Sequence, residues 1–113
     1  RYENMVASHL LKFCNLWEDT KGEDMDLQFL RNAQGKEIDF VVLKNQKPWF
    51  AVECKTDDRN LSKQISYYAD RTSIPTFFQV HLGTKDYEVK KYRARVCPFH
   101  KLCEWVSLNS PNV

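Results

Sequence analysis

Three short runs of alternating apolar residues, framed by two amphipathic segments, constrain the fold of this chain more than any other feature. Apolar side chains recur at every second position in each run, which is the period of half-buried β-strands. The links between the runs are short and rich in turn-forming residues, so we expect an antiparallel meander of three strands. The runs are Met25–Asn32, Glu37–Leu43 and Trp49–Lys55.

Two flanking segments have the 3.6-residue period of amphipathic helices. The first covers residues 3–17, and the second covers residues 61–72 after a stretch of capping residues. A strand is expected next, at Thr76–Leu82. Because a helix separates this strand from the third strand of the meander, the two should run parallel.

The end of the chain adds a predicted strand at Tyr87–Val96 and a short helix after Pro98. The order helix-strand-strand-strand-helix-strand predicts an α/β fold, with a central mixed β-sheet flanked by helices. A chain of 113 residues is about the size of one domain, so we expect one domain over residues 1–113.

Composition and charge limit the classes of function. The apolar share of 42% is too high for a disordered chain, and no apolar run approaches the ~20 residues of a membrane span. We therefore expect a cytoplasmic protein with no membrane partner. Residues 1–30 carry 3 basic and 6 acidic side chains, whereas residues 59–113 carry 9 and 4. A basic C-terminal part is compatible with a nucleic-acid partner, and equally with an ordinary solvated surface.

The four cysteines lack the density and spacing of a disulfide scaffold, so we expect reduced thiols. Cys97, His100 and Cys103 recur every three residues and, with Cys14, offer four ligands for a zinc or iron–sulfur site. The chain has no CxxC pair, and Cys14 lies in the apolar stripe of the first helix. Buried single thiols are the preferred interpretation.

Asp39, Glu53 and Lys55 form the pattern with the most chemical content. Side chains two apart on a strand share a face, so Glu53 and Lys55 should lie side by side. Asp39, on the preceding strand, comes close to Glu53 if the strands are hairpin neighbours. Two adjacent carboxylates repel each other, and Mg²⁺ or Mn²⁺, which prefer oxygen ligands, would remove the repulsion. Such a site suits phosphodiester hydrolysis, although a surface cross-strand ion pair explains the same residues.

The same residues resemble a known superfamily. Asp39, then 13 residues, then Glu53-Cys54-Lys55, in this order of helices and strands, resembles the PD-(D/E)xK nucleases, also called the restriction-endonuclease-like fold. Ile38 stands where the superfamily has its proline. The segment from Gln64 to Tyr68 resembles the QxxxY motif of the RecB-like branch.

Three further segments resemble an uncharacterised domain that lies C-terminal to the AAA+ module in many bacterial and archaeal ATPases. The segments are Tyr2–Ala7, Gly35–Val42 and Val52–Lys55. This resemblance implies that the chain is the C-terminal part of a longer ATPase, with the N-terminal AAA+ portion absent from this sequence. The chain has no GxxxxGK[ST] motif and should not bind ATP through a P-loop.

The resemblance to the nucleases implies a role for each matching residue. Asp39 and Glu53 would bind Mg²⁺ or Mn²⁺ together with the backbone carbonyl of Cys54. Lys55 would position the attacking water, and Glu3 would touch the metal or its waters. Gln64 and Tyr68 would orient the site or the nucleic-acid backbone.

Basic residues concentrate in the last predicted strand. Lys91, Arg93 and Arg95 would share one face of that strand and contact phosphates. A charged edge strand that resists pairing with other chains explains the same pattern.

These observations predict a metal-dependent nuclease that acts on DNA in preference to RNA. Two other classes stay open. One is a catalytically silent nucleic-acid-binding or regulatory module on the same fold. The other is a structural dimerisation domain, which would show a large apolar patch on its surface.

Overall fold

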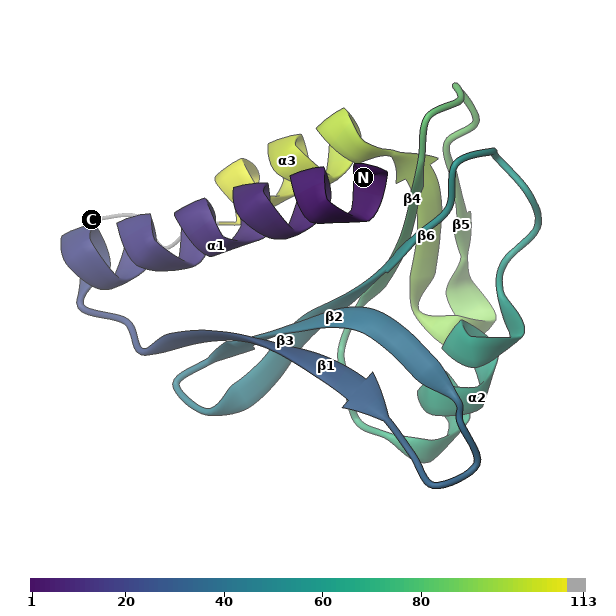
Figure 1. Ribbon diagram of the computed structural model, residues 1–113, viewed down its shortest axis with the longest axis horizontal. Helices are drawn as coiled ribbons and strands as arrows, with labels where there is room; N and C mark the ends of the chain where they lie inside the picture. The colour runs from purple at the N-terminus through teal and green to yellow at the C-terminus, as the bar shows by residue number, and fades with distance from the viewer. Residues whose placement is uncertain (110–113) are drawn as a thin grey trace.

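The computed structural model describes residues 1–109 and shows a six-stranded mixed sheet with helices on both faces (Figure 1). The predicted α/β class and the predicted order of the core elements are confirmed. The last four residues of the predicted 1–113 domain lie outside the described residues. The elements are α1 (Tyr2–Lys21), β1 (Met25–Arg31), β2 (Glu37–Lys44), β3 (Lys47–Cys54), α2 (Lys63–Arg71), β4 (Phe77–His81), β5 (Tyr87–Val89), η1 (Lys90–Tyr92), β6 (Ala94–Pro98) and α3 (Phe99–Leu108).

The strands lie in the order β1-β2-β3-β4-β6-β5. β1, β2 and β3 form the predicted antiparallel meander, and β4 is parallel to β3, as a crossover through α2 requires. The hairpin between β2 and β3 turns on Asn45 and Gln46, whose φ angles of 53° and 69° match the two-residue turns typical of tight hairpins. The tight turn lets β3 begin at Lys47, two residues before the predicted start.

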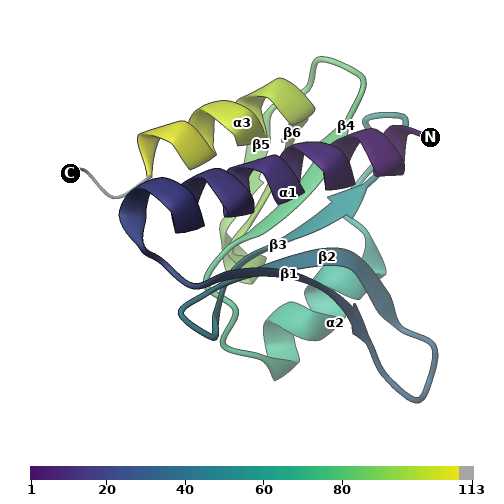
Figure 2. The same cartoon turned by 60° about the vertical axis from the view of Figure 1, so that its left-hand side comes forward.

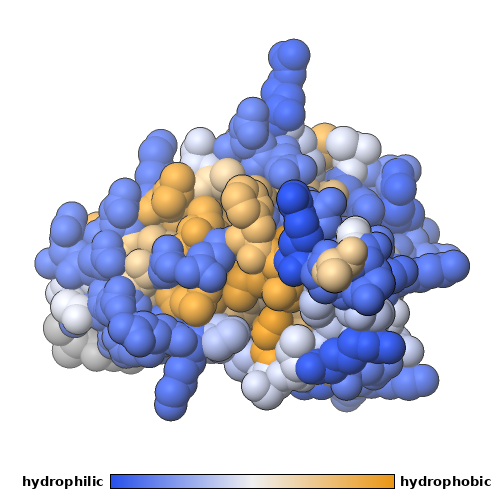
Figure 3. All heavy atoms as spheres, turned by 60° about the horizontal axis from the view of Figure 1, so that its bottom comes forward, coloured by the Kyte–Doolittle hydropathy of each residue, from blue (hydrophilic) through white to orange (hydrophobic). Residues whose placement is uncertain are grey.

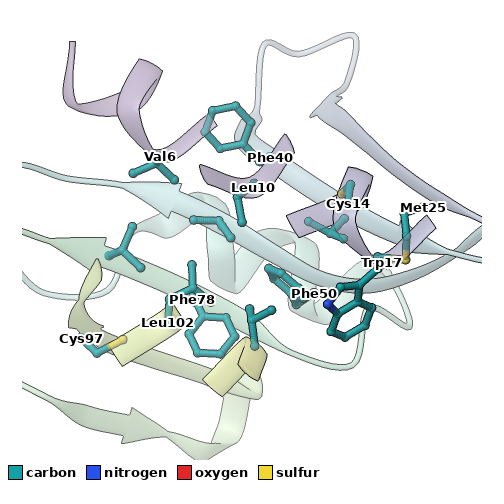
Figure 4. Packing of buried hydrophobic residues seen from close by; sticks show 14 residues of the cluster. Val6, Leu10, Cys14, Trp17, Met25, Phe40, Phe50, Phe78, Cys97 and Leu102 are labelled. Carbon is teal, nitrogen blue, oxygen red and sulfur yellow. The ribbon is translucent and has the colours of Figure 1, made fainter. Parts of the chain in front are cut away.

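α1 and α3 lie side by side on one face of the sheet (Figure 2). The α1 stripe of Val6, Leu10 and Trp17 packs into a core that includes Phe50 and Phe78 (Figure 4). The helix ends at Lys21 and is capped by Gly22, whose φ of 68° allows its N–H to donate to the carbonyl of Glu18. Helix and sheet are thereby held together by a continuous apolar layer.

α2 covers part of the opposite face, where Ile65 and Tyr68 pack against Ile38 and Phe77. The centre of the sheet is therefore buried on both sides, as is usual where a crossover helix covers parallel strands. No helix within residues 1–109 is long and apolar enough to cross a membrane.

The outer part of the α2 face is uncovered under β1, β2 and β3. Figure 3 shows hydrophobic side chains gathered on the side of the molecule that faces away from α1 and α3. Phe29 is 75% exposed there. It lines a hollow of about 220 Å³ together with Leu30, Val41, Leu43 and Ile74.

The predicted single strand Tyr87–Val96 is wrong. The chain instead forms β5, the turn η1 and β6, and the φ of 54° at Arg93 reverses its direction so that β5 pairs antiparallel with β6. Lys91 lies in the turn, Arg93 at its end and Arg95 in β6. The three basic residues therefore do not share a strand face.

Two of these basic side chains are held by contacts within the protein. The Arg93 guanidinium donates to the backbone carbonyls of Ala69, Thr72 and Ile74, which joins the β5–β6 hairpin to the end of α2. Arg95 donates to both carboxylate oxygens of Asp86, at 2.8 and 2.7 Å. These contacts give Arg93 and Arg95 structural roles.

Replacing Arg93 with alanine is expected to lower the free energy of unfolding by about 2 kcal/mol, because three carbonyls lose a charged donor. Lys91→Ala, in the same turn, removes an exposed cation that makes no ion pair within residues 1–109, and should change stability by less than about 0.5 kcal/mol. Urea denaturation of both variants measures the difference. Equal losses would contradict the structural role of Arg93.

Candidate active site

β2 and β3 separate at Asp39. Hydrogen bonds from backbone N–H groups to carboxylate oxygens replace the backbone–backbone bonds between the two strands there. The last regular pair toward the carboxyl end of β3 is Phe40 with Val52. Beyond it, the Asp39 N–H donates to Glu53 Oε1 at 3.2 Å, and the Cys54 N–H donates to Asp39 Oδ2 at 2.8 Å. This exchange holds the two carboxyl groups close together, so the predicted proximity of Asp39 and Glu53 is confirmed.

A bulge in β2 sets the direction of the strand at Asp39. Between the pairs made by Gln28 and Leu30 of β1, β2 contains one more residue than its partner. As a result, Ile38 packs in the core under α2, whereas Phe40 packs in the core under α1. Regular alternation along the run Glu37–Leu43 would place Ile38 and Phe40 on one face, but alternation fails at Asp39.

Glu53 is buried, with only 6% of its surface exposed. Its burial, and next the nearby charge of Asp39, raise the pKa of the Glu53 carboxyl to about 7. The Lys55 ammonium, whose Nζ lies 3.7 Å from Glu53 Oε2, opposes this increase in the Glu53 pKa. The Lys55 side chain is 26% exposed, so water weakens its effect. One partly exposed cation therefore faces two carboxylates, of which Glu53 is buried.

The donor set fits a hard divalent cation. Asp39 Oδ1 accepts no hydrogen bond from the residues that the structure describes, so one oxygen stays open. Ala51 and Lys55 direct their N–H groups to carbonyls of the neighbouring parallel segment, so by alternation the Cys54 carbonyl points toward β2 and Asp39. Two carboxylates and a carbonyl, completed by water, are typical ligands of Mg²⁺ and Mn²⁺.

Glu3 lies exposed on the first turn of α1. Burial, then the charge of Asp39 and then the charge of Glu3 raise the pKa of the Cys54 thiol. The role of Glu3 as a ligand stays a prediction. Within residues 1–109, no three His, Cys, Asp or Glu side chains group around one point, and the alternative metal site of Cys97, His100 and Cys103 gains no support.

Tyr68 is 5% exposed, and its hydroxyl donates to the Lys36 carbonyl at 2.7 Å. This bond ties α2 to the chain that enters β2, three residues before Asp39. Contact with nucleic acid does not fit this placement, and Tyr68 instead positions the strand that carries Asp39. Gln64, in the first turn of α2, is partly exposed, and its predicted role is not tested by any contact.

Tyr68→Phe is expected to reduce the free energy of unfolding by about 1 kcal/mol, because the Lys36 carbonyl loses its donor. Tyr92→Phe is the matched control, since the Tyr92 hydroxyl makes no hydrogen bond within the described residues. It should change stability by less than about 0.5 kcal/mol. Denaturant midpoints that fall no further for Tyr68→Phe than for the control would exclude the positioning role.

Gln79 contributes to the site although the sequence analysis did not identify it. It is fully buried in β4, in register with Glu53 of β3. Its Oε1 accepts from the Ser62 N–H at 2.8 Å, and its Nε2 donates to the carbonyls of Arg59 and Asn60. The side chain therefore fixes the loop between Lys55 and α2. A glutamine inside the apolar run Thr76–Leu82 was the available signal, because a buried amide needs partners.

Comparison with known proteins identifies a family without a known activity. Residues 1–102 match the family model described as a domain of unknown function (DUF4143). The match covers the meander, the crossover and both carboxylates of the site. No curated protein and no solved structure matches the chain.

Proposed function

We propose that this chain, which belongs to the DUF4143 family, is a metal-dependent nuclease domain of the PD-(D/E)xK type that hydrolyses phosphodiester bonds in DNA in preference to RNA. One observation carries the proposal. Where β2 and β3 part, the Asp39 N–H donates to Glu53 and the Asp39 carboxylate accepts from the Cys54 N–H, with the Lys55 ammonium 3.7 Å from Glu53.

The residues of the site have complementary roles in this proposal. Asp39, Glu53 and the Cys54 carbonyl would hold Mg²⁺ or Mn²⁺, which supplies Lewis acidity toward a phosphate oxygen and lowers the pKa of bound water. Lys55 orients the attacking water and offsets negative charge on the phosphate. Its partial exposure, 26% of the side chain, leaves the ammonium accessible to substrate.

The wider context of the proposal rests on resemblance. We include Glu3 and Gln64 as residues that assist the metal site, and an AAA+ ATPase portion as the partner that precedes the domain. The match to an uncharacterised family agrees with the resemblance of the three segments to an ATPase-linked domain.

A cleavage assay with the 113-residue chain tests the proposal. Labelled single- and double-stranded DNA and RNA are incubated with Mn²⁺, Mg²⁺ or EDTA. We expect cleavage products with Mn²⁺, faster loss of DNA than of RNA, and no products with EDTA. Salt-sensitive binding without cleavage of any substrate would favour the silent nucleic-acid-binding module instead.

Self-association is the second candidate function, and the exposed apolar patch around Phe29 favours it. A second copy of the chain would cover this patch. Sedimentation velocity distinguishes the candidates, because a dimer that Phe29→Glu dissociates, in a protein without cleavage activity, would identify a structural dimerisation domain.

A further inference from the structure

A cationic surface lies beside the site, on the turn between β1 and β2 and on α2. Its centre is Tyr67, which is partly exposed. The Arg71 guanidinium lies 3.8 Å from the centroid of the Tyr67 ring, and Lys36 Nζ lies 5.8 Å from it. Both distances are within the range of cation–π attraction, so the ring holds two positive charges near each other.

Hydrogen bonds fix the two elements that carry these cations. Asn32 accepts from the Lys36 N–H within the turn and donates from Nδ2 to the Tyr67 hydroxyl at 2.8 Å. The Tyr68 hydroxyl donates to the Lys36 carbonyl. Turn and helix are therefore joined at both tyrosines, and the two cations are held in place before any ligand arrives, which lowers the entropic cost of binding.

Five of the 17 lysines and arginines form an ion pair within residues 1–109. Arg31, Arg59 and Arg95 each form an ion pair with a nearby carboxylate. Within residues 1–109, neither Lys36 nor Arg71 forms such a pair. Arg71 donates from Nη1 to the Tyr67 carbonyl at 3.1 Å, which leaves N–H groups for an external anion.

We propose that Lys36 and Arg71 bind backbone phosphates of a nucleic-acid strand and guide it to the Asp39–Glu53 site, an inference that rests on the proposed function. Lys36 precedes Asp39 by three residues, or ~10 Å of extended chain. That length corresponds to about three nucleotides along one strand of a duplex. Because Lys36 and Arg71 lie beside the Tyr67 ring, the contact with the phosphates is made by charge and is independent of base sequence.

A paired charge removal tests the inference. Binding of a labelled DNA oligonucleotide to Lys36→Gln/Arg71→Gln is measured in EDTA, so that neither metal nor cleavage contributes. We expect affinity to fall at least about tenfold at 0.1 M salt, and the slope of log K against log salt to shrink by about 2. Lys12→Gln/Lys47→Gln, which removes two exposed cations from α1 and from the start of β3, should keep the slope of the unchanged protein.

The outcomes separate this inference from the nuclease proposal. Equal binding by both double variants, or no binding by the unchanged protein, overturns the inference even if the protein cleaves DNA. Loss of binding confined to Lys36→Gln/Arg71→Gln supports the inference even if no cleavage is found. If thermal melting shows that this double variant is unfolded, the single variant Lys36→Gln should still shrink the slope by about 1, and an unchanged slope counts against the inference.

Discussion

Replacing Lys55 with methionine is expected to slow Mn²⁺-dependent cleavage about a thousandfold, because the variant loses the group that orients water and offsets phosphate charge. Methionine keeps the length of the apolar stem. The ammonium also opposes the increase in the pKa of Glu53, so its removal makes the carboxylates harder to ionise together. Single-turnover cleavage with excess protein and saturating Mn²⁺ measures the loss.

Lys63→Met is the matched control for this prediction. Lys63 begins α2, is exposed and forms no ion pair within the described part of the chain, so its replacement should leave the rate within about threefold. Asp39→Asn gives a second test, since asparagine retains an acceptor for the Cys54 N–H and removes the charge. Cleavage by Lys55→Met at more than about a tenth of the original rate would exclude Lys55 from the chemistry.

The sequence was sufficient for the order of elements because the apolar periods are strong and local. The strands of the meander, the crossover and the parallel direction of β4 follow from period, turns and connection length. The β5–β6 hairpin did not follow, because its reversal depends on a positive φ at Arg93, where no glycine signals the turn. The three carbonyls that Arg93 binds come from distant positions and favour this conformation.

The proximity of Asp39 and Glu53 was predictable because hairpin strands bring facing residues together. The burial of Glu53 was not predictable from alternation alone, since alternation does not show which elements cover its face of β3, where Ala51 packs against α2. The roles of Tyr68 and Gln79 depend on bonds to backbone carbonyls far away in sequence. Such bonds leave no periodic pattern, and only the placement of α2 over the sheet reveals them.

Without a divalent cation, the stability of the protein is expected to fall between about pH 4.5 and about pH 7. The Glu53 pKa is about 7 in the folded state and about 4.5 in the unfolded chain. The folded state therefore binds the Glu53 proton more tightly than the unfolded chain does. Loss of this proton lowers the free energy of unfolding by up to about 3 kcal/mol once the pH exceeds 7. Urea denaturation in EDTA at several pH values measures the decline, which Glu53→Gln should lack.

Mn²⁺ should restore this lost stability because the cation and the proton compete for the same oxygens. We expect saturating Mn²⁺ to raise the thermal midpoint by roughly 10 °C near pH 8 and by very little near pH 5. Glu53→Gln should show neither effect. An equal increase at both pH values would mean that Mn²⁺ binds elsewhere. Because the measurement needs no turnover, it tests whether the paired carboxylates form a cation site even in a protein that does not cleave nucleic acid.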